Sequence, residues 1–391
     1  MRSMRIIAFT ILMLLMSAAQ ATNLFSKHKF GSQSAVLVTD ANGKDLYAWN
    51  PDKALIPAST VKIITGIAAI ERFGLDFKFR TDFFHKGSTL WVKGYGDPFL
   101  TSEELDIVVL NLIRKINLQF LHVNRVVVDG THFPLLKVPG REISNQPYDA
   151  PLAAVSANFN TINIRKSGKV IASAEPQTPI TPLAKQLASK LTDGVHRINL
   201  RQTDISEQYF AELLVAKFKE HGFKGDIESK TGFTPLEAKL VYQHVNSKTM
   251  LEAVHGMMVF SNNFIANQLF LQMRSPDTPI SFSASSDYVK QLLGKNLGDL
   301  QIVEGSGLSR KNKLTARQLN ALLLRFEPHK RLMKSYLNGK AYAKSGSLNG
   351  VHNLAGYISK NGKDYYFTFL FNQGVPWRFR NTLMQELYAT L

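Results

Sequence analysis

The sequence predicts a mixed α/β fold of the α+β type, with one antiparallel sheet flanked by helices and an inserted second domain. Strand-like segments gather near both ends of the chain, within residues 34–49 and 341–371. Between residues 75 and 238 the sequence pattern differs, because short segments typical of strands alternate with segments typical of helices. A chain of 391 residues is also longer than one hydrophobic core commonly supports.

The first 21 residues are expected to lie outside the fold. Arg2 and Arg5 form a basic start, residues 6–16 are apolar, and Ala19-Gln20-Ala21 resembles a cleavage site. The apolar run is too short to span a bilayer, so we predict a secretory signal peptide rather than a membrane anchor. Residues 1–21 would then be removed, and an exported, periplasmic or cell-envelope protein would begin near Thr22.

Composition narrows the possible chemistry. The chain has no cysteine, which excludes disulfides, cysteine-bound zinc and a thiol nucleophile. Its ten histidines show no metal-ligand spacing, and no Gly-rich phosphate loop is present, so no metal or cofactor is predicted. His352 is interpreted as a packed side chain rather than a functional one.

The chain carries a net charge of +17, which favours polyanionic partners. For an exported protein these are peptidoglycan carboxylates, with peripheral contact to anionic lipid head groups as a second source. Nucleic acid is disfavoured, because no recognisable nucleic-acid module accompanies the charge.

The first elements of the catalytic domain, assigned to residues 22–74 and 239–391, are a hairpin and a helix. Strands at Ser34–Thr39 and Asp45–Trp49 flank the turn Asp40–Lys44. An apolar helix follows at Ser59–Phe73 and ends at Gly74.

The inserted domain is assigned to residues 75–238. Its predicted strands are Leu90–Lys93, Asn124–Asp129 and Thr161–Arg165, and its helices are Glu103–Ile116, Pro182–Leu191 and Ile205–His221. The helices expected after it are Lys248–Val259, Asn263–Met273, Ser286–Leu293 and Ala316–Phe326. The chain closes with strands at Ala341–Lys344, Asn353–Ser359 and Asp364–Phe371 and a helix from Arg378.

Three short motifs occur in a fixed order: Ser59-Thr60-Val61-Lys62, Ser261-Asn262-Asn263 and Lys344-Ser345-Gly346. They read as S-x-x-K, S-x-N and K-[ST]-G, the set found in serine acyl-transferases that handle D-alanyl peptides and β-lactams. Two other strings also fit these patterns, and one of them, Lys230-Thr231-Gly232, is a literal K-T-G. Ser26-Lys27-His28-Lys29 lacks a following helix, and Lys230-Thr231-Gly232, which we place in a turn ending the insertion, precedes the S-x-N motif.

The spacing within the first motif supports nucleophilic catalysis. Ser59 and Lys62 lie one helical turn apart on one face, so the amine can reach the hydroxyl. A serine hydroxyl needs a base, and a lysine can serve if burial and nearby cations lower its pKa from about 10.4.

The other two motifs offer a proton relay and a substrate strand. The Ser261 hydroxyl can pass a proton to a leaving amine, and Asn263 can hold a substrate backbone. Lys344 can pair with a terminal carboxylate, while its strand binds an extended peptide that Gly346 lets approach closely. The N–H groups of Ser59 and Ser347 are candidates for an oxyanion hole.

Flanking segments extend the similarity. The chain resembles the D-alanyl-D-alanine carboxypeptidase/endopeptidase family, the low-molecular-mass class C penicillin-binding proteins, over essentially its whole mature length. The segments that carry this resemblance are Ile56-Pro57-Ala58-Ser59-Thr60-Val61-Lys62, Gly94-Tyr95-Gly96-Asp97-Pro98, Glu304-Gly305-Ser306-Gly307-Leu308-Ser309-Arg310 and Asn353-Leu354-Ala355-Gly356-Tyr357.

The resemblance implies a β-lactamase/transpeptidase-like fold with a five-stranded antiparallel sheet, and a serine DD-peptidase acting on peptidoglycan stem peptides. It implies Ser59 as nucleophile, Lys62 as base, and a relay and substrate-binding set of Ser261, Asn263 and Lys344. Ser345 and Ser347 stand where threonine is common, and both keep a hydroxyl for substrate binding.

Two alternatives stay open. One is a β-lactamase-like hydrolase, with Glu304 as a water-activating base; the 202 positions between Ser59 and Ser261 exceed the gap of compact β-lactamases. The other is a non-catalytic cell-wall-binding protein, which would be expected to have lost at least one of the three motifs.

Overall fold

The computed structural model describes residues 24–116, 122–295 and 297–391, so the predicted signal peptide lies outside it. Packing divides the chain into two compact units. Unit 1 takes the chain up to Ile67 together with Leu293–Val303 and Gly307–Leu391, and unit 2 takes Ala68–Leu292 and Glu304–Ser306. Within the described ranges, no helix is both long enough and apolar enough to span a bilayer.

Unit 1 is built on an antiparallel sheet that joins the two ends of the chain, as predicted. The sheet has six strands in the order β11-β12-β13-β14-β1-β2. Five of them were expected, and the sixth, β11, has only three residues and no pattern long enough to reveal it. The strands are β1 (Ser34–Asp40), β2 (Asp45–Trp49), β11 (Lys334–Tyr336), β12 (Ala341–Leu348), β13 (Val351–Lys360) and β14 (Lys363–Phe371).

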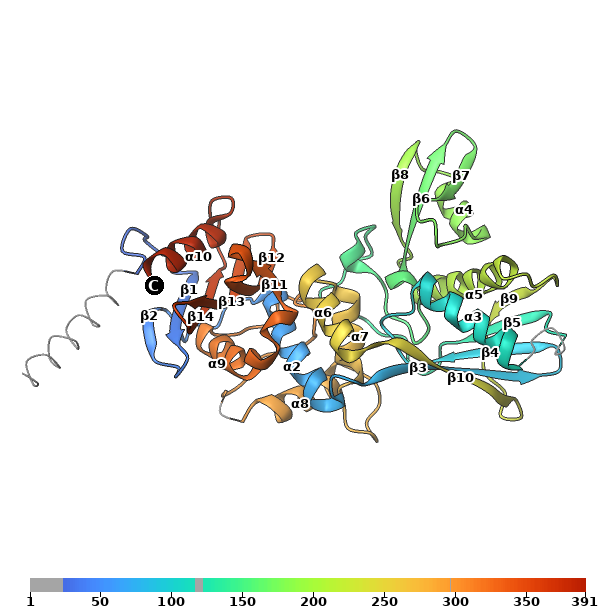
Figure 1. Cartoon of the computed structure of the whole chain (residues 1–391), viewed down its shortest axis with the longest axis horizontal. Coiled ribbons are helices and arrows are strands. Elements are labelled where there is room, and N and C mark those ends of the chain that lie inside the picture. The colour runs from blue at the N-terminus through green and yellow to red at the C-terminus, as the bar shows by residue number, and fades with distance from the viewer. Residues whose placement is uncertain (1–23, 117–121, 296) are drawn as a thin grey trace, which may run out of the picture. The chain divides into compact units, whose positions relative to one another are not determined.

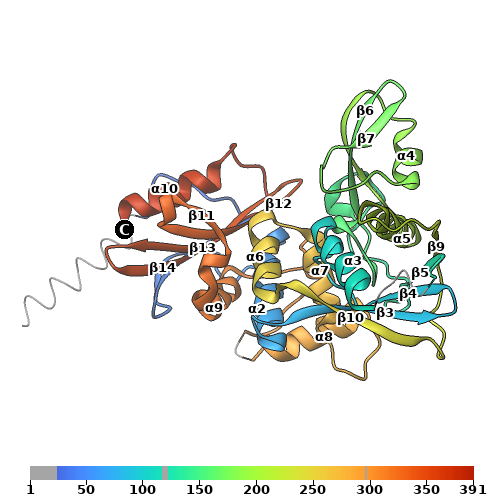
Figure 2. The same cartoon turned by 45° about the vertical axis from the view of Figure 1, so that its right-hand side comes forward.

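Both faces of this sheet are covered by helices (Figures 1 and 2). Helix α10 (Phe379–Thr390) buries Leu383 and Met384 against one face, where they join Phe367 and Phe369 of β14. Helix α9 (Ala316–Phe326) packs on the other face, and its Asn320 accepts a hydrogen bond of 2.7 Å from the Thr368 hydroxyl. Because successive strand residues point to opposite faces, both sets of β14 side chains are buried.

The predicted helix at Ser59–Phe73 is confirmed, with a tighter first turn. A 3₁₀ turn, η1 (Ala58–Val61), leads directly into α2 (Lys62–Phe73). Gly74 ends the helix with a φ of +82°, a conformation that glycine adopts without the Cβ clash of other residues.

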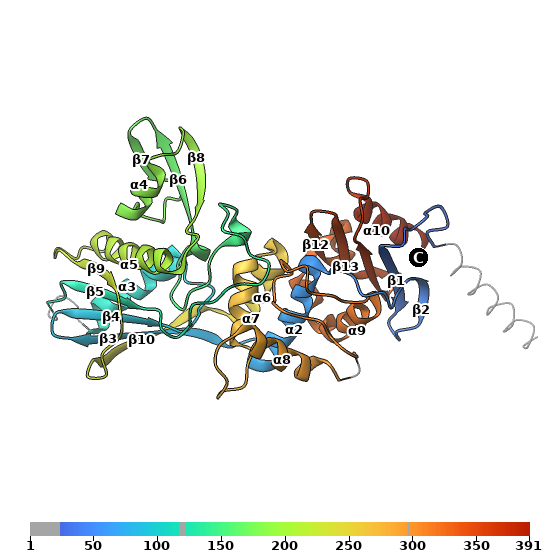
Figure 3. The same ribbon diagram turned by 180° about the vertical axis from the view of Figure 1, so that it is seen from behind.

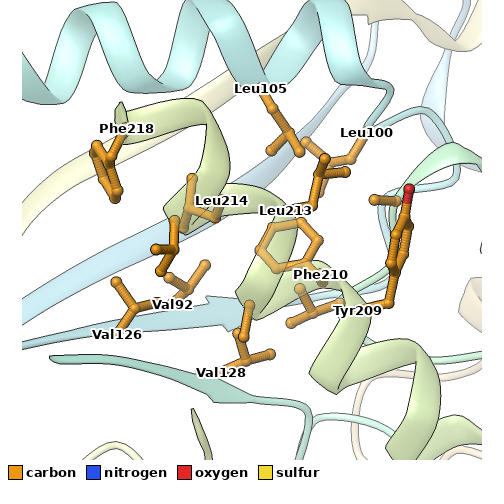
Figure 4. Close-up of a cluster of buried hydrophobic side chains, with 14 of the residues drawn as sticks. Val92, Leu100, Leu105, Val126, Val128, Tyr209, Phe210, Leu213, Leu214 and Phe218 are labelled. Carbon is orange, nitrogen blue, oxygen red and sulfur yellow. The ribbon is translucent and has the colours of Figure 1, made fainter. Parts of the chain in front are cut away.

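Unit 2 holds a five-stranded sheet in the order β10-β3-β4-β5-β9. The strands are β3 (Lys78–Lys86), β4 (Thr89–Gly94), β5 (Arg125–Asp129), β9 (Glu228–Thr231) and β10 (Lys239–Thr249). Helices α3 (Ser102–Ile116) and α5 (Thr203–Glu220) supply much of its core. Figure 4 shows Phe210 and Leu214 of α5 facing Val92 and Val126 of the sheet.

Unit 2 also carries a smaller sheet and a group of helices. Strands β6 (Thr161–Ser167), β7 (Val170–Ser173) and β8 (Gly194–Asn199) form the order β7-β6-β8, with α4 (Pro182–Ala188) beside it (Figure 3). The remaining helices are α6 (Met250–Phe260), α7 (Asn263–Gln272) and α8 (Phe282–Leu293). All the predicted helices are present, with ends shifted by up to four residues.

The segment Lys230-Thr231-Gly232 is not the turn that we expected. Lys230 and Thr231 lie in β9, which pairs with β5 in parallel at the edge of the unit 2 sheet. Lys230 forms an exposed ion pair with Glu228 at 2.7 Å. A four-residue strand rich in Ser, Thr and Lys gives too weak an apolar pattern to recognise. The division at residues 74 and 238 stays a prediction.

Candidate active site

The first motif is assembled within unit 1. The Lys62 side-chain nitrogen donates a hydrogen bond of 2.9 Å to the Ser59 hydroxyl oxygen, as the spacing predicts. Lys62 has no exposed surface, although lysine is rarely buried without a partner. A buried amine in contact with a hydroxyl is the arrangement that serine activation by lysine requires.

The turn that carries Ser59 has an uncommon backbone. Ala58 has a φ of +46°, in a region that residues with a Cβ seldom occupy. The Thr60 hydroxyl donates to the Pro57 carbonyl at 2.7 Å and closes the turn. Such a backbone persists only where the surroundings hold it in place.

The side chains of Asn353 and Asn372 keep this backbone segment in place through hydrogen bonds. The Asn353 side chain donates to the carbonyls of Ile56 and Pro57, both at 2.9 Å, while its own oxygen accepts from the Phe371 N–H. The Asn372 side chain donates to the Ile56 carbonyl at 3.1 Å and accepts from the Ile56 N–H at 2.7 Å. The segment before the nucleophile is therefore fixed to β13 and to the end of β14.

Two glycines let other backbone segments approach this turn. A Cβ on Gly346 would lie 2.6 Å from the Pro57 oxygen and 3.1 Å from the Ser59 nitrogen. A Cβ on Gly307, whose φ is +86°, would lie 2.0 Å from the Ala58 oxygen. Gly346 was expected to let the substrate approach closely; in the structure it also lets β12 lie against the nucleophile turn.

Lys344 lies on β12 and is buried, with 1% of its surface exposed. Its ammonium donates to the Ser345 carbonyl at 2.9 Å. Burial lowers the pKa of Lys344 well below its usual value, and the positive charges of Lys62 and Arg380 lower it further. Lys62 and Lys344 are thus both buried near the nucleophile turn, and the charge of Lys62 helps to disfavour the protonated form of Lys344.

Arg380 of α10 supports the third motif, a role that its sequence position does not reveal. One guanidinium nitrogen, Nη1, donates to the Gly346 carbonyl at 3.0 Å, the Ser347 hydroxyl at 2.8 Å and the Asn353 carbonyl at 3.0 Å. The same side chain thus holds the ends of β12 and β13 together beside Ser347.

The S-x-N motif belongs to unit 2, where it forms the junction of α6 and α7. Ser261 ends α6 in the left-handed conformation, with a φ of +55°. Asn262 caps α7 by accepting the Ile265 N–H at 3.0 Å. Asn263 begins α7 and donates to the Tyr148 carbonyl at 3.2 Å. The tight reversal between two helices fixes the direction of the Ser261 and Asn263 side chains.

A cavity of about 620 Å³ adjoins this junction within unit 2. Ser261 and Asn263 line it together with aromatic side chains and one arginine. These are Phe99, Tyr148, Phe159, Phe260, Phe264 and Arg197. The junction therefore has room beside it for part of a ligand.

Glu304, the residue considered as a water-activating base, is engaged by its own loop. Its carboxylate accepts the N–H and the hydroxyl of Ser306 at 2.8 and 2.5 Å, and the side chain has no exposed surface. The neighbouring Gly305 N–H is held by the Asn267 side chain at 2.9 Å. These contacts give Glu304 a structural role in the loop that leads to Gly307.

The structure therefore brings together Ser59, Lys62, Lys344 and Gly346 within unit 1, and Ser261 with Asn263 within unit 2. Asn353, Asn372, Gly307 and Arg380 were missed as supporting residues. Asn353 could have been identified from the sequence, because a buried amide near the start of an apolar strand needs hydrogen-bond partners. In the described part of the chain, no group of three or more acidic or histidine side chains is placed to hold a metal ion.

The sequence of this chain is similar to those of known proteins. Residues 18–196 and 192–338 match the D-Ala-D-Ala carboxypeptidase 3 (S13) family. The chain is 24% identical to penicillin-sensitive carboxypeptidase A of Dictyostelium discoideum, over 85% of this chain and 80% of that protein. It is also 24% identical to D-alanyl-D-alanine carboxypeptidase DacB of Haemophilus influenzae, over 86% and 85%.

Solved structures share the fold. Penicillin binding protein 4 of Haemophilus influenzae superposes with a TM-score of 0.72 at 20% identity, covering 94% of this chain and 99% of that one. A predatory peptidoglycan endopeptidase of Bdellovibrio bacteriovorus gives a TM-score of 0.53 at 16% identity, covering 90% of each chain. The predicted α+β fold class is thereby confirmed.

Proposed function

The chain belongs to the D-Ala-D-Ala carboxypeptidase 3 (S13) family, and from this membership we propose how its own residues perform the family's reaction. It is a serine DD-peptidase that acts on peptidoglycan stem peptides through an acyl-enzyme and is acylated by β-lactams. The observation that carries the residue assignment is the 2.9 Å hydrogen bond from the Lys62 amine to the Ser59 hydroxyl.

In the acylation step, Lys62 removes the proton from Ser59, and the Ser59 oxygen attacks the carbonyl of the penultimate D-alanine. The bound peptide extends the sheet along β12, and its terminal carboxylate pairs with Lys344. Ser345 and Ser347 contribute hydroxyls along this strand. The N–H groups of Ser59 and Ser347 stabilise the developing oxyanion.

The leaving amine needs a proton, which Ser261 supplies from Lys62 in this mechanism, while Asn263 holds the substrate backbone. Water, activated again by Lys62, then releases the peptide. When the amine belongs to free D-alanine the reaction is a carboxypeptidase reaction. When it belongs to the cross-linking side chain of a second stem peptide, the same steps cleave a cross-link.

We infer export to the periplasm or cell envelope, because the substrate lies there and residues 1–21 have the pattern of a secretory signal peptide. The positive net charge of +17 supports attraction to the carboxylates of peptidoglycan. Contact with anionic lipid head groups would use the same charge.

The proposed peptidase differs from a β-lactamase because it hydrolyses its β-lactam acyl-enzyme slowly. A β-lactamase needs a group that activates water for rapid hydrolysis of the acyl-enzyme. Glu304 accepts two hydrogen bonds from Ser306 and is buried, which supports a structural role rather than this one. Turnover of nitrocefin at enzyme-like rates would contradict the proposal.

Labelling with fluorescent penicillin tests the nucleophile. Wild-type protein should be labelled covalently, and intact mass should rise by one penicilloyl group. Ser59→Ala should abolish both, whereas Ser26→Ala, in the competing S-x-x-K string, should leave both unchanged. Labelling that survives in Ser59→Ala would refute the assignment. Mass analysis of products from pentapeptide monomers and cross-linked dimers then shows which bonds are cleaved.

A further inference from the structure

A second cavity, of about 360 Å³, lies within unit 1 beside the end of the K-[ST]-G strand. We call it the Arg378 pocket. Its walls include Ser347 of β12, His352 of β13, and Trp377, Arg378 and Arg380 from the segment that enters α10. None of the described residues that line it is Asp or Glu. The lining is therefore positively charged.

The protein does not neutralise this charge itself. In the described part of the chain, neither Arg378 nor Arg380 forms an ion pair with a carboxylate. Arg380 is anchored by Nη1 to the Gly346 carbonyl and the Ser347 hydroxyl, so its guanidinium holds a fixed position. Arginine keeps its charge in proteins and binds carboxylates in a planar, two-point fashion.

Trp377 adds an apolar wall. Trp377 is 89% exposed, so its ring is accessible to a ligand in the pocket that it lines. An indole next to two guanidinium groups offers a surface for the hydrocarbon part of a ligand whose charged end reaches the arginines.

The register of β12 decides which face of a bound peptide meets this pocket. Gly346 faces the nucleophile turn, since a Cβ there would lie 3.1 Å from the Ser59 nitrogen. Alternate strand residues face opposite sides, so Ser345 and Ser347 face α10, in agreement with the Ser347–Arg380 hydrogen bond.

The edge of β12 also leaves space for a peptide. β11 pairs only with Ala341 to Ala343 of β12. A peptide added along Lys344–Leu348 would alternate its substituents in the same way as the strand. One set would face Ser59, and the other would face the side of the sheet on which the Arg378 pocket opens, beside Ser347.

We propose that the Arg378 pocket binds a second carboxylate of the stem peptide being cleaved, one other than the terminal carboxylate held by Lys344. This inference rests on the proposed function, because it assumes that the peptide lies along β12. It gives the enzyme a means to prefer stem peptides with free side-chain carboxylates over peptides in which these groups are amidated.

The test compares two pentapeptides that both keep the terminal D-alanine carboxylate, one with free and one with amidated side-chain carboxylates. The variant is Arg378→Asn in the full-length enzyme, because Arg378 has a φ of +64° and asparagine tolerates that conformation. The control is Arg331→Asn, which removes the same charge from an exposed position in η4 (Glu327–Leu332).

For Arg378→Asn, kcat/KM for the free-acid peptide should fall about three- to tenfold, mainly through KM. Cleavage of the amidated peptide and the rate of fluorescent penicillin labelling should stay unchanged, and Arg331→Asn should change none of the three. The inference is overturned if Arg378→Asn affects both peptides equally, affects neither, or is matched by Arg331→Asn. Failure of the proposed function has a different signature: hydrolysis that persists in Ser59→Ala.

Discussion

Gly346 of β12 lies so close to Pro57 that a Cβ atom on the glycine would be only 2.6 Å from the Pro57 carbonyl oxygen. Two backbone segments almost 290 positions apart in the sequence therefore touch, without side chains between them, next to the nucleophile. The position of Ser59 relative to the substrate strand depends on this contact.

Gly346→Ala should push β12 away from the nucleophile turn, because the added methyl group meets backbone atoms that cannot rotate aside. A displacement of about 1 Å can cost about 100-fold in rate, and we expect a loss of that order in the acylation rate with fluorescent penicillin. Gly374→Ala is the matched control, since a Cβ there meets nothing within 4 Å. Equal rates in the two variants would argue against the contact.

Asn353→Ala should destabilise unit 1 and loosen the nucleophile turn. The change removes two donors to the carbonyls of Ile56 and Pro57 and the acceptor of the Phe371 N–H. Leaving buried polar groups unpaired costs about 2–4 kcal/mol in unfolding free energy in total. Denaturant unfolding checks this value, with the exposed Asn42→Ala as a control expected to stay within about 0.5 kcal/mol of wild type.

Lys344→Met should abolish peptide cleavage and yet stabilise the fold at neutral pH. Burial, with the charges of Lys62 and Arg380, holds the pKa of Lys344 well below 10.5 in the folded state. Between that lowered pKa and 10.5 the unfolded chain binds more protons than the folded one, so the free energy of unfolding of wild type rises with pH. Methionine removes this dependence.

The stability gained by Lys344→Met should therefore be largest below the lowered pKa and shrink as pH approaches 10.5. Thermal unfolding of both proteins across this range measures it. A gap that stays constant with pH would mean that burial does not disfavour the charged form of Lys344.

Ser261→Gly and Ser261→Ala separate the chemistry of this residue from its backbone conformation. Both remove the hydroxyl, so turnover of peptide should fall about 10²–10³-fold in each if the hydroxyl transfers a proton. Because Ser261 has a φ of +55°, the glycine variant should be the more stable by about 1 kcal/mol. A glycine variant with wild-type turnover would exclude the relay.

Much of the fold can be predicted because its elements have strong local patterns. The hairpin at the N-terminus, the apolar helix after Ser59 and the aromatic strand β14 each bury one or two faces, and their spacing is visible in the sequence. Strands β3 and β10 were missed, because polar residues occupy buried positions within them: Thr81 and Asp82 in β3, and His244 and Asn246 in β10. The short strands β11 and β9 form because neighbouring strands pair with them, and their own residues show no clear strand pattern.

The sequence alone determined the reactive groups, because a serine and a lysine three positions apart share one side of a helix whatever surrounds it. Only the tertiary structure decided how they are held. The buried hydrogen bonds of Asn353, the close approach at Gly346 and Gly307, and the anchoring by Arg380 each join segments far apart in the chain. Such contacts leave no periodic signal, because they depend on which backbone atoms meet after the two ends of the chain have formed one sheet.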